Sequence, residues 1–190
     1  MASESTRQGA CAPTSAPGDP TAQAQPARAE HSRFVQRVRR RYAAELALLA
    51  PGVPRREQVL ALVAQLQSTG RALPAALRVA RQLVLERLAV LDVEQGAALA
   101  DVTQAMTELA EATLGLALRQ AQDELDARYG APRDTAGKRI AFWVIGMGKL
   151  GGRELNVSSD IDLVYVYADA GMTDGGDGAR RVSAHEYFSQ

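Results

Sequence analysis

The hydrophobic period of the sequence changes once, at Pro132, and this change restricts the possible folds more than any other feature. Between His31 and Tyr129 the apolar residues recur every three or four positions, which is the period of one helix face. After Pro132 they form short runs rich in β-branched and aromatic side chains, which are typical of strands. The sequence therefore predicts an α+β fold, with a helical region at residues 31–131 followed by the start of a mixed sheet at residues 132–190.

Four helices are expected in the helical region. Their buried stripes of leucine, valine and methionine are more typical of a packed core than of a ligand pocket, so we assign these helices no chemistry. The expected helices run from His31 to Pro51-Gly52, near Glu57 to Gln67, from Pro74, and from Leu99 to Tyr129-Gly130. The residues expected to face inward are Phe34, Val38, Tyr42, Leu46, Leu49, Val59, Leu62, Val63, Leu66, Leu77, Ala80, Val84, Leu88, Leu91, Leu99, Val102, Met106, Leu109, Thr113 and Leu116.

Residues 1–30 differ in composition from the rest of the chain. They are mostly Ala, Pro, Ser, Thr, Gln and Gly, and they contain no apolar block of the kind found in a signal peptide. We expect them to form a disordered tail. Cys11 lies in this tail and is the single cysteine of the chain, so no internal disulfide is expected, which fits a reducing cytoplasm.

The overall charge argues against two classes of partner. The 190 residues include 22 Lys and Arg and 22 Asp and Glu, so no net field attracts a nucleic acid or an anionic membrane. No apolar run approaches the roughly 20 residues needed to span a bilayer. The outer face of the first helix carries Arg37, Arg39, Arg40 and Arg41, which could contact a phosphate, although such a face is more often only solvated. Because the chain has no net charge, any polyanion must be bound at a local site.

Two short strands are expected in the second part of the chain, at residues 139–145 and 161–167. A connection rich in glycine, residues 146–159, joins them. Further on, Ser183 is followed three positions later by Glu186, which is the spacing of a helix capping box. We therefore expect a strand, a glycine-rich turn, a second strand and the first turn of another helix.

Asp160 and Asp162 are the main candidate catalytic and metal-binding residues. Because they stand two positions apart at the start of the second expected strand, their side chains should emerge on one face of the sheet. Two neighbouring carboxylates repel each other unless a cation lies between them, and hard oxygen ligands of this kind suit Mg²⁺ bound together with substrate phosphates. Phosphoryl and nucleotidyl transfer need this combination of metal and phosphate binding.

The glycine-rich turn supplies the candidate phosphate-binding groups. Gly148, Gly151 and Gly152 allow backbone N–H groups to approach a phosphate closely. Lys149 and Arg153 could meet the phosphates as cations, and both could equally be surface charges. The remaining candidates are Ser158 and Ser159, which could touch a phosphate or only hold the turn.

A dinucleotide-binding fold is the main alternative for this segment. Residues 146–151 satisfy the pattern G-x-G-x-x-G after an expected strand, and Asp169 lies near the distance expected of a ribose partner. However, a parallel crossover needs a full helix between the strands, and the turn has room for barely two helical turns. A Walker A loop is excluded because Leu150 follows Lys149.

The segment from Gly146 to Tyr165 closely resembles the signature of the glutamine synthetase (glutamate-ammonia-ligase) adenylyltransferases, which are members of the polymerase β-like nucleotidyltransferase superfamily. Residues 154–162 are similar to the amino-terminal copy of this motif, and residues 185–188 are similar to the next helix of the family. The resemblance implies an adenylyl-removing domain in which phosphate attacks the adenylyl-tyrosine of glutamine synthetase and releases ADP. It also implies Mg²⁺ as cofactor, a site for ATP, ADP and phosphate, and glutamine synthetase and the PII signal protein as partners.

Two departures from the superfamily pattern limit what the resemblance implies. The superfamily usually has Gly-Ser where Gly148-Lys149 stands here, a substitution that is characteristic of this family. A third metal-binding carboxylate would come from a later strand, beyond Gln190, so we expect the sequence to be a fragment that is inactive alone. The alternative functions are a non-catalytic regulatory or interaction fragment and, less favoured, a dinucleotide-binding oxidoreductase.

Overall fold

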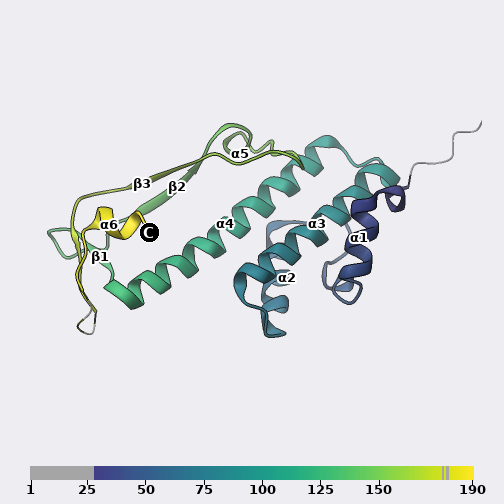
Figure 1. Ribbon diagram of the computed structural model, residues 1–190. Coiled ribbons are helices and arrows are strands. Elements are labelled where there is room, and N and C mark those ends of the chain that lie inside the picture. Colours follow the sequence, from purple (N-terminus) through teal and green to yellow (C-terminus); the bar gives the residue numbers. More distant parts are fainter. Residues whose placement is uncertain (1–27, 177, 179) are drawn as a thin grey trace, which may run out of the picture.

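The computed structural model describes residues 28–176, 178 and 180–190. The expected disordered tail, with Cys11, falls outside these residues except for its last three positions. There the short helix η1 (Ala29–His31) buries Ala29, whose backbone N–H donates a hydrogen bond to Glu94. Figure 1 shows an elongated molecule in which one long helix, α4 (Leu99–Tyr129), connects a helical bundle at one end to short strands at the other.

The bundle consists of α1 (Arg33–Arg41), α2 (Arg56–Ser68), α3 (Leu73–Gln95) and the first half of α4. The bounds of α2, α3 and α4 confirm the prediction, and the apolar residues that recur along α2 and α3 are buried as stripes. Pro74 occupies the first turn of α3, and Gly96 ends α3 in the left-handed conformation. This part of the helical region therefore folds as its period predicts.

The first helix is shorter than predicted. It ends at Arg41, and Leu46–Leu48 forms a separate 3₁₀ turn, η2. Leu49, which follows the turn, is buried in the core, so apolar residues at helical spacing are buried here without one continuous helix. Arg39 was expected on the outer face, but its Nε donates to the buried Glu86 of α3 at 2.7 Å.

Leu99 is the clearest error among the predicted core residues. Its side chain is 75% exposed, whereas Val102, Met106 and Leu109 on the same stripe are buried. Leu99 is the first residue of α4 and precedes the part of the helix that packs on α2 and α3. The period of the sequence is continuous through Leu99, but the core contacts of α4 begin after it, at Val102.

Two antiparallel strand pairs follow the bundle. The longer pair joins β2 (Phe142–Gly146) to β3 (Leu163–Tyr167), with Trp143 opposite Val166 and Ile145 opposite Val164. The shorter pair joins β1 (Pro132–Arg133) to β4 (Met172–Thr173).

Both long strands are shorter than predicted. The expected first strand began at residue 139, but Arg139 forms a bridge with Arg133 and the N–H of Ile140 donates to the carbonyl of Pro132. Residues 139 and 140 therefore belong beside β1, and Ile140 is buried there. The second expected strand loses residues 161 and 162 at its start.

The β2–β3 hairpin is attached to the bundle through its connecting turn. Leu150 and Leu155 of the turn are buried in the same core as α2, α3 and α4. The N–H of Leu155 donates to the hydroxyl of Thr107, a residue of α4 with no exposed surface. Figure 1 shows the turn, with α5 (Gly148–Gly151), lying over α4. These contacts set the position of the glycine-rich turn.

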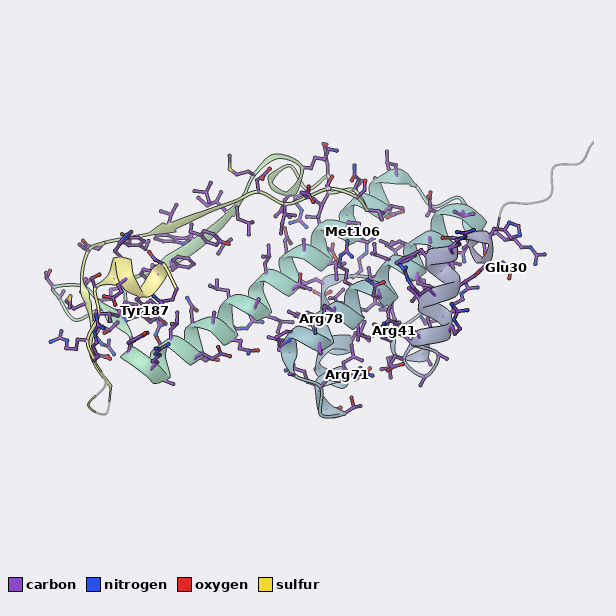
Figure 2. The ribbon with its side chains drawn as sticks, in the orientation of Figure 1. Glu30, Arg41, Arg71, Arg78, Met106 and Tyr187 are labelled. Atoms are coloured by element: carbon purple, nitrogen blue, oxygen red, sulfur yellow. The ribbon has the colours of Figure 1, made fainter. Side chains whose placement is uncertain are left out.

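The last helix, α6 (Ala184–Phe188), packs at the opposite end of the hairpin. Ser183 caps it by accepting a hydrogen bond from the N–H of Glu186 at 3.0 Å, which confirms the Ser183 half of the predicted capping box, while the carboxylate of Glu186 accepts from Arg180. Figure 2 shows Tyr187 at this end of the molecule and Met106 among the packed helices. Among the residues that the structure describes, no helix combines the length and the apolar character that a membrane span requires.

Candidate functional site

The hairpin places the acid pair beside the glycine-rich turn. The N–H of Met147, the residue before Gly148, donates to the carbonyl of Asp162 at 2.9 Å. Asp162 therefore lies directly across from the start of the turn. Asp160 and Asp162 are both exposed, and both precede β3, which begins at Leu163, so they lie in the segment leading into the strand and not within it.

The burial pattern indicates which way the hairpin presents Asp162. Leu163 packs against the helical core, whereas the next residue, Val164, is 44% exposed. Because side chains alternate between the two faces of an extended segment, Asp162 shares the face of Val164 and points away from the bundle. The carboxylate thus stands on the solvent side of the hairpin.

Three glycines of the turn differ in whether the fold requires a glycine at that position. Gly148 has a φ of +53°, which favours glycine. A side chain on Gly151 would place its Cβ 2.5 Å from the carbonyl oxygen of Gly146, so the neighbouring backbone leaves no room for a side chain at this position. Gly152 has neither restriction: its φ is −76° and the nearest atom to a Cβ there would be 3.5 Å away. The fold alone does not require glycine at position 152.

The N–H groups of the turn fall into two sets. Those of Gly151, Gly152, Arg153 and Glu154 donate to carbonyls within the turn itself. Those of residues 148–150 lie in the first turn of α5, and a helix offers no internal acceptor to the N–H groups of its first turn. The second set contains the backbone donors that could meet a phosphate.

The two candidate cations of the turn have different surroundings. Lys149 is exposed and forms no ion pair with any residue that the structure describes. Arg153 has a φ of +58°, and its guanidinium donates to the carboxylate of Glu111 on α4. Glu111 also pairs with Arg56 at 3.6 Å. Both side chains are exposed, but Arg153 ties the turn to the helical region, whereas Lys149 has no ion-pair partner among the described residues.

Asn156, which was not among the residues predicted for the site, holds the two serines in place through hydrogen bonds. The Oδ1 of Asn156 accepts hydrogen bonds from the N–H of Ser158 at 3.2 Å and from the hydroxyl of Ser159 at 2.7 Å. The hydroxyl of Ser158 also points to this oxygen, at 3.4 Å. The signal was present in the sequence, because Asn two residues before Ser is a common side-chain-to-backbone turn. Both serines thus hold the loop that leads to Asp160.

The donor set suits a metal ion only in part. Asp160 and Asp162 supply oxygen ligands of the kind that Mg²⁺ prefers, and neither carboxylate is paired with a cation in the described part of the chain. Within residues 28–176, 178 and 180–190, no group of three acidic, His or Cys side chains could enclose a metal. Phosphate oxygens and water would have to complete the coordination of an ion at this pair.

The geometry excludes the dinucleotide-binding alternative. The strands on either side of the turn are antiparallel, and α5 has only four residues, whereas a dinucleotide fold needs parallel strands and a full helix. Asp169, the expected ribose partner, accepts a hydrogen bond from the N–H of Ala170 and lies past the far end of β3.

These features define an α+β protein in which a helical region supports a glycine-rich hairpin with two solvent-facing carboxylates. A family model described as glutamate-ammonia ligase adenylyltransferase matches residues 29–190. The chain belongs to this family, as the resemblance of its hairpin turn predicted.

Individual relatives agree with the family model. The chain is 51% identical over 119 residues to a bifunctional glutamine synthetase adenylyltransferase/adenylyl-removing enzyme of Burkholderia mallei. It is 48% identical over 120 residues to the protein of the same name in Chromobacterium violaceum. Each match covers 63% of this chain and 13% of the relative, so the chain spans a small part of the length of the curated proteins that it matches.

Proposed function

We propose that this chain provides part of the adenylyl-removing site of a glutamine synthetase adenylyltransferase, with Asp160 and Asp162 as ligands of Mg²⁺. The observation that carries the proposal is the position of Asp162, which lies across from Met147 at the start of the glycine-rich turn. Metal ligands and phosphate donors are then adjacent, as nucleotidyl transfer requires. The names of the relatives, which include an adenylyl-removing activity, support the same reaction.

In the proposed reaction an oxygen of inorganic phosphate attacks the phosphorus of an adenylyl group carried on a tyrosine of glutamine synthetase. The bond from that phosphorus to the tyrosine oxygen breaks, ADP forms, and the tyrosine oxygen takes up a proton. The N–H groups of residues 148–150 and the side chain of Lys149 would bind phosphate oxygens. A bound Mg²⁺ would neutralise charge on the transferred group.

The remaining partners and the location follow from the family and are part of the same proposal. ATP, ADP and phosphate are the expected small ligands, PII the expected regulatory protein, and the cytoplasm the expected compartment. Arg153, Ser158 and Ser159 would act by holding the turn, because their side chains already bond to Glu111 and Asn156.

A second candidate is a non-catalytic interaction fragment of the same family. It is favoured by one observation, namely that the described residues bring only two carboxylates to the site and no third ligand. A fragment of this kind would bind a partner through its surface without turning over the nucleotide. The two candidates differ in whether the acid pair binds nucleotide in a metal-dependent way.

Titration of the chain with ADP in the presence and absence of Mg²⁺, followed by calorimetry, tests the proposal. We expect binding that depends on Mg²⁺ and that is weakened about tenfold or more in Asp160→Asn and Asp162→Asn. Asp169→Asn is the matched control, because it removes an exposed acid at the other end of β3. Equal binding by the unaltered chain and the two acid variants would exclude the assigned metal ligands and leave the interaction fragment as the better account.

A further inference from the structure

Glu111 on α4 lies between two arginines that come from different parts of the chain. Its Oε1 accepts a hydrogen bond from the guanidinium of Arg153 in the glycine-rich turn. Its other oxygen, Oε2, lies 3.6 Å from the guanidinium of Arg56, the first residue of α2. Because each oxygen of the carboxylate faces one arginine, α2 helps to hold Glu111 in the orientation in which it meets the turn.

Arg153 has a backbone conformation that an arginine does not favour. Its φ of +58° lies in the left-handed region, which glycine adopts more readily. The residue before it, Gly152, has a φ of −76°, which any residue adopts. The turn thus has an arginine where its backbone favours glycine. An unfavourable conformation persists where the surrounding contacts determine it, and the side chain of Arg153 makes such a contact with Glu111.

The backbone of Arg153 is bonded to the segment that carries the phosphate donors. The N–H of Arg153 donates to the carbonyl of Leu150 at 3.1 Å, and the N–H of Glu154 donates to the carbonyl of Lys149 at 2.8 Å. These bonds close residues 149–154 into one hydrogen-bonded unit. A displacement of Arg153 would therefore also displace the N–H groups at the start of α5.

Thr107 attaches the same turn to α4 at a second point. Residues four apart lie on one face of a helix, so Thr107 and Glu111 face the turn together. The hydroxyl of Thr107 is buried and accepts a hydrogen bond from the N–H of Leu155 at 3.3 Å. The bond to Leu155 holds the chain where it leaves the turn toward Asp160, whereas Glu111 holds the part that carries the N–H donors.

The exposure of the Arg153–Glu111 pair indicates what the pair contributes. The two side chains are 53 and 32% exposed. An ion pair so accessible to water contributes little to the free energy of unfolding, so the stability of the whole fold does not account for an arginine in this conformation. The pair can still decide how often one loop opens, because local opening has its own free energy.

We infer that Glu111 is a positioning residue of the nucleotide site, which acts through Arg153 to hold the phosphate-binding turn in place. The inference rests on the proposed function and adds a residue of the helical region, for which the sequence predicted no chemistry. Glu111 itself does not touch the ligand. Its effect on binding comes from the position of the N–H groups of residues 148–150.

Amide hydrogen exchange of the chain without ligand tests whether Glu111 holds the turn. In Glu111→Gln and Arg153→Gln we expect the hydrogen-bonded N–H groups of residues 151–155 to exchange about tenfold faster. The double variant should exchange no faster than either single variant, because both changes break the same pair. Arg153→Lys keeps a cation and should retain most of the protection. Asp101→Asn is the matched control, since it removes an acid of α4 whose ion pair with Arg55 does not involve the turn.

Titration with ADP and Mg²⁺ tests whether this attachment serves the site. Glu111→Gln and Arg153→Gln should bind ADP about tenfold more weakly, by equal amounts, while Asp101→Asn binds it as the unaltered chain does. The midpoint of urea unfolding should be the same in all four proteins. Direct contact of Arg153 with a phosphate predicts a different result, because Glu111→Gln would then release the guanidinium and bind ADP at least as tightly as the unaltered chain.

The two measurements separate this inference from the proposed function. If the unaltered chain and Glu111→Gln bind ADP equally well, the metal site stands and the inference is wrong. If the unaltered chain does not bind ADP but exchange is faster in both single variants, the metal site is wrong and the attachment of the turn by Glu111 stands. Unchanged exchange in Glu111→Gln overturns the inference. A lower urea midpoint in both variants also overturns it, since the pair would then serve the stability of the whole fold.

Discussion

The hydroxyl of Tyr187 donates a hydrogen bond of 2.6 Å to Oδ1 of Asp126, a residue 61 positions earlier in the chain. The guanidinium of Arg139 donates to both oxygens of the same carboxylate. These three residues join α6, the last turns of α4 and the segment before β2. The end of the hairpin away from the acid pair is thus attached to α4 through one shared carboxylate.

Tyr187→Phe should destabilise the protein by roughly 1–2 kcal/mol, because the variant loses a hydrogen bond to a charged group in a buried position. Urea unfolding followed by circular dichroism measures this change in the free energy of unfolding. Tyr165→Phe is the matched control: its ring is 61% exposed, and its loss of a hydroxyl should change stability by less than about 0.5 kcal/mol. Equal destabilisation by the two variants would show that the hydrogen bond to Asp126 contributes nothing.

The same tyrosine should make stability depend on pH in alkaline solution. Burial, together with the hydrogen bond to Asp126, raises the pKa of Tyr187 above its ordinary value of 10.0. Above that value an unfolded chain releases the tyrosine proton while the folded chain retains it, so the unfolded state is favoured as pH rises. The stabilising contribution is therefore complete below about pH 10 and is lost progressively above it.

Unfolding measured at about pH 9 and about pH 11 tests this dependence. The free energy of unfolding should fall more for the unaltered chain than for Tyr187→Phe over this interval, so the two stabilities should converge. A constant difference between them would mean that the folded chain does not hold the proton of Tyr187.

Gly130→Ala should destabilise the protein by roughly 1–3 kcal/mol or more. Gly130 follows α4 with a φ of +76°, and a Cβ there would lie 2.1 Å from Oδ1 of Asp174 and 2.6 Å from the N–H nitrogen of Gly175. Gly137→Ala separates the two causes, because Gly137 has a φ of +79° but no atom within 4 Å of the point that a Cβ would occupy. Thermal unfolding should show a larger loss of stability for Gly130→Ala than for Gly137→Ala. Equal losses would show that the collision of the added Cβ with Asp174 and Gly175 costs no stability.

Gly152→Ala should leave folding unchanged and weaken the Mg²⁺-dependent binding of ADP. The backbone at this position suits any residue and the nearest atom to an added Cβ is 3.5 Å away, so under the proposed function an added methyl group would obstruct a ligand and not the fold. Gly151→Ala is the contrasting variant and should destabilise the fold, because its Cβ would meet the carbonyl oxygen of Gly146 at 2.5 Å. Normal ADP binding by a folded Gly152→Ala protein would remove Gly152 from the phosphate site.

Local features of the sequence were sufficient to predict most of the helices and the hairpin. The bounds of α2, α3 and α4 follow from apolar period, from Pro74 and from Gly130, each of which acts on its own few neighbours. The cap at Ser183 could also be predicted, because Ser183 and Glu186 are only three positions apart. The motif around Asp160 and Asp162 could be recognised because its residues are consecutive, although β3 begins just after them.

Contacts between distant residues could not be predicted in the same way. The hydrophobic period did not show that α1 ends at Arg41 while Leu49 is still buried, or that Leu99 is exposed. The ion pair of Arg153 with Glu111 joins residues 42 positions apart, and it decides that this cation holds the turn.

The sequence by itself determined the α+β class, the main helices and the glycine-rich turn with its two acids, because hydrophobic period and backbone preference act over a few consecutive residues. Only the tertiary structure decided that Asp162 faces away from the bundle, that Thr107 and Glu111 anchor the turn, and that Trp143 and Val164 of the hairpin are exposed. These relationships depend on packing between elements far apart in the chain, for which a single sequence carries no local signal.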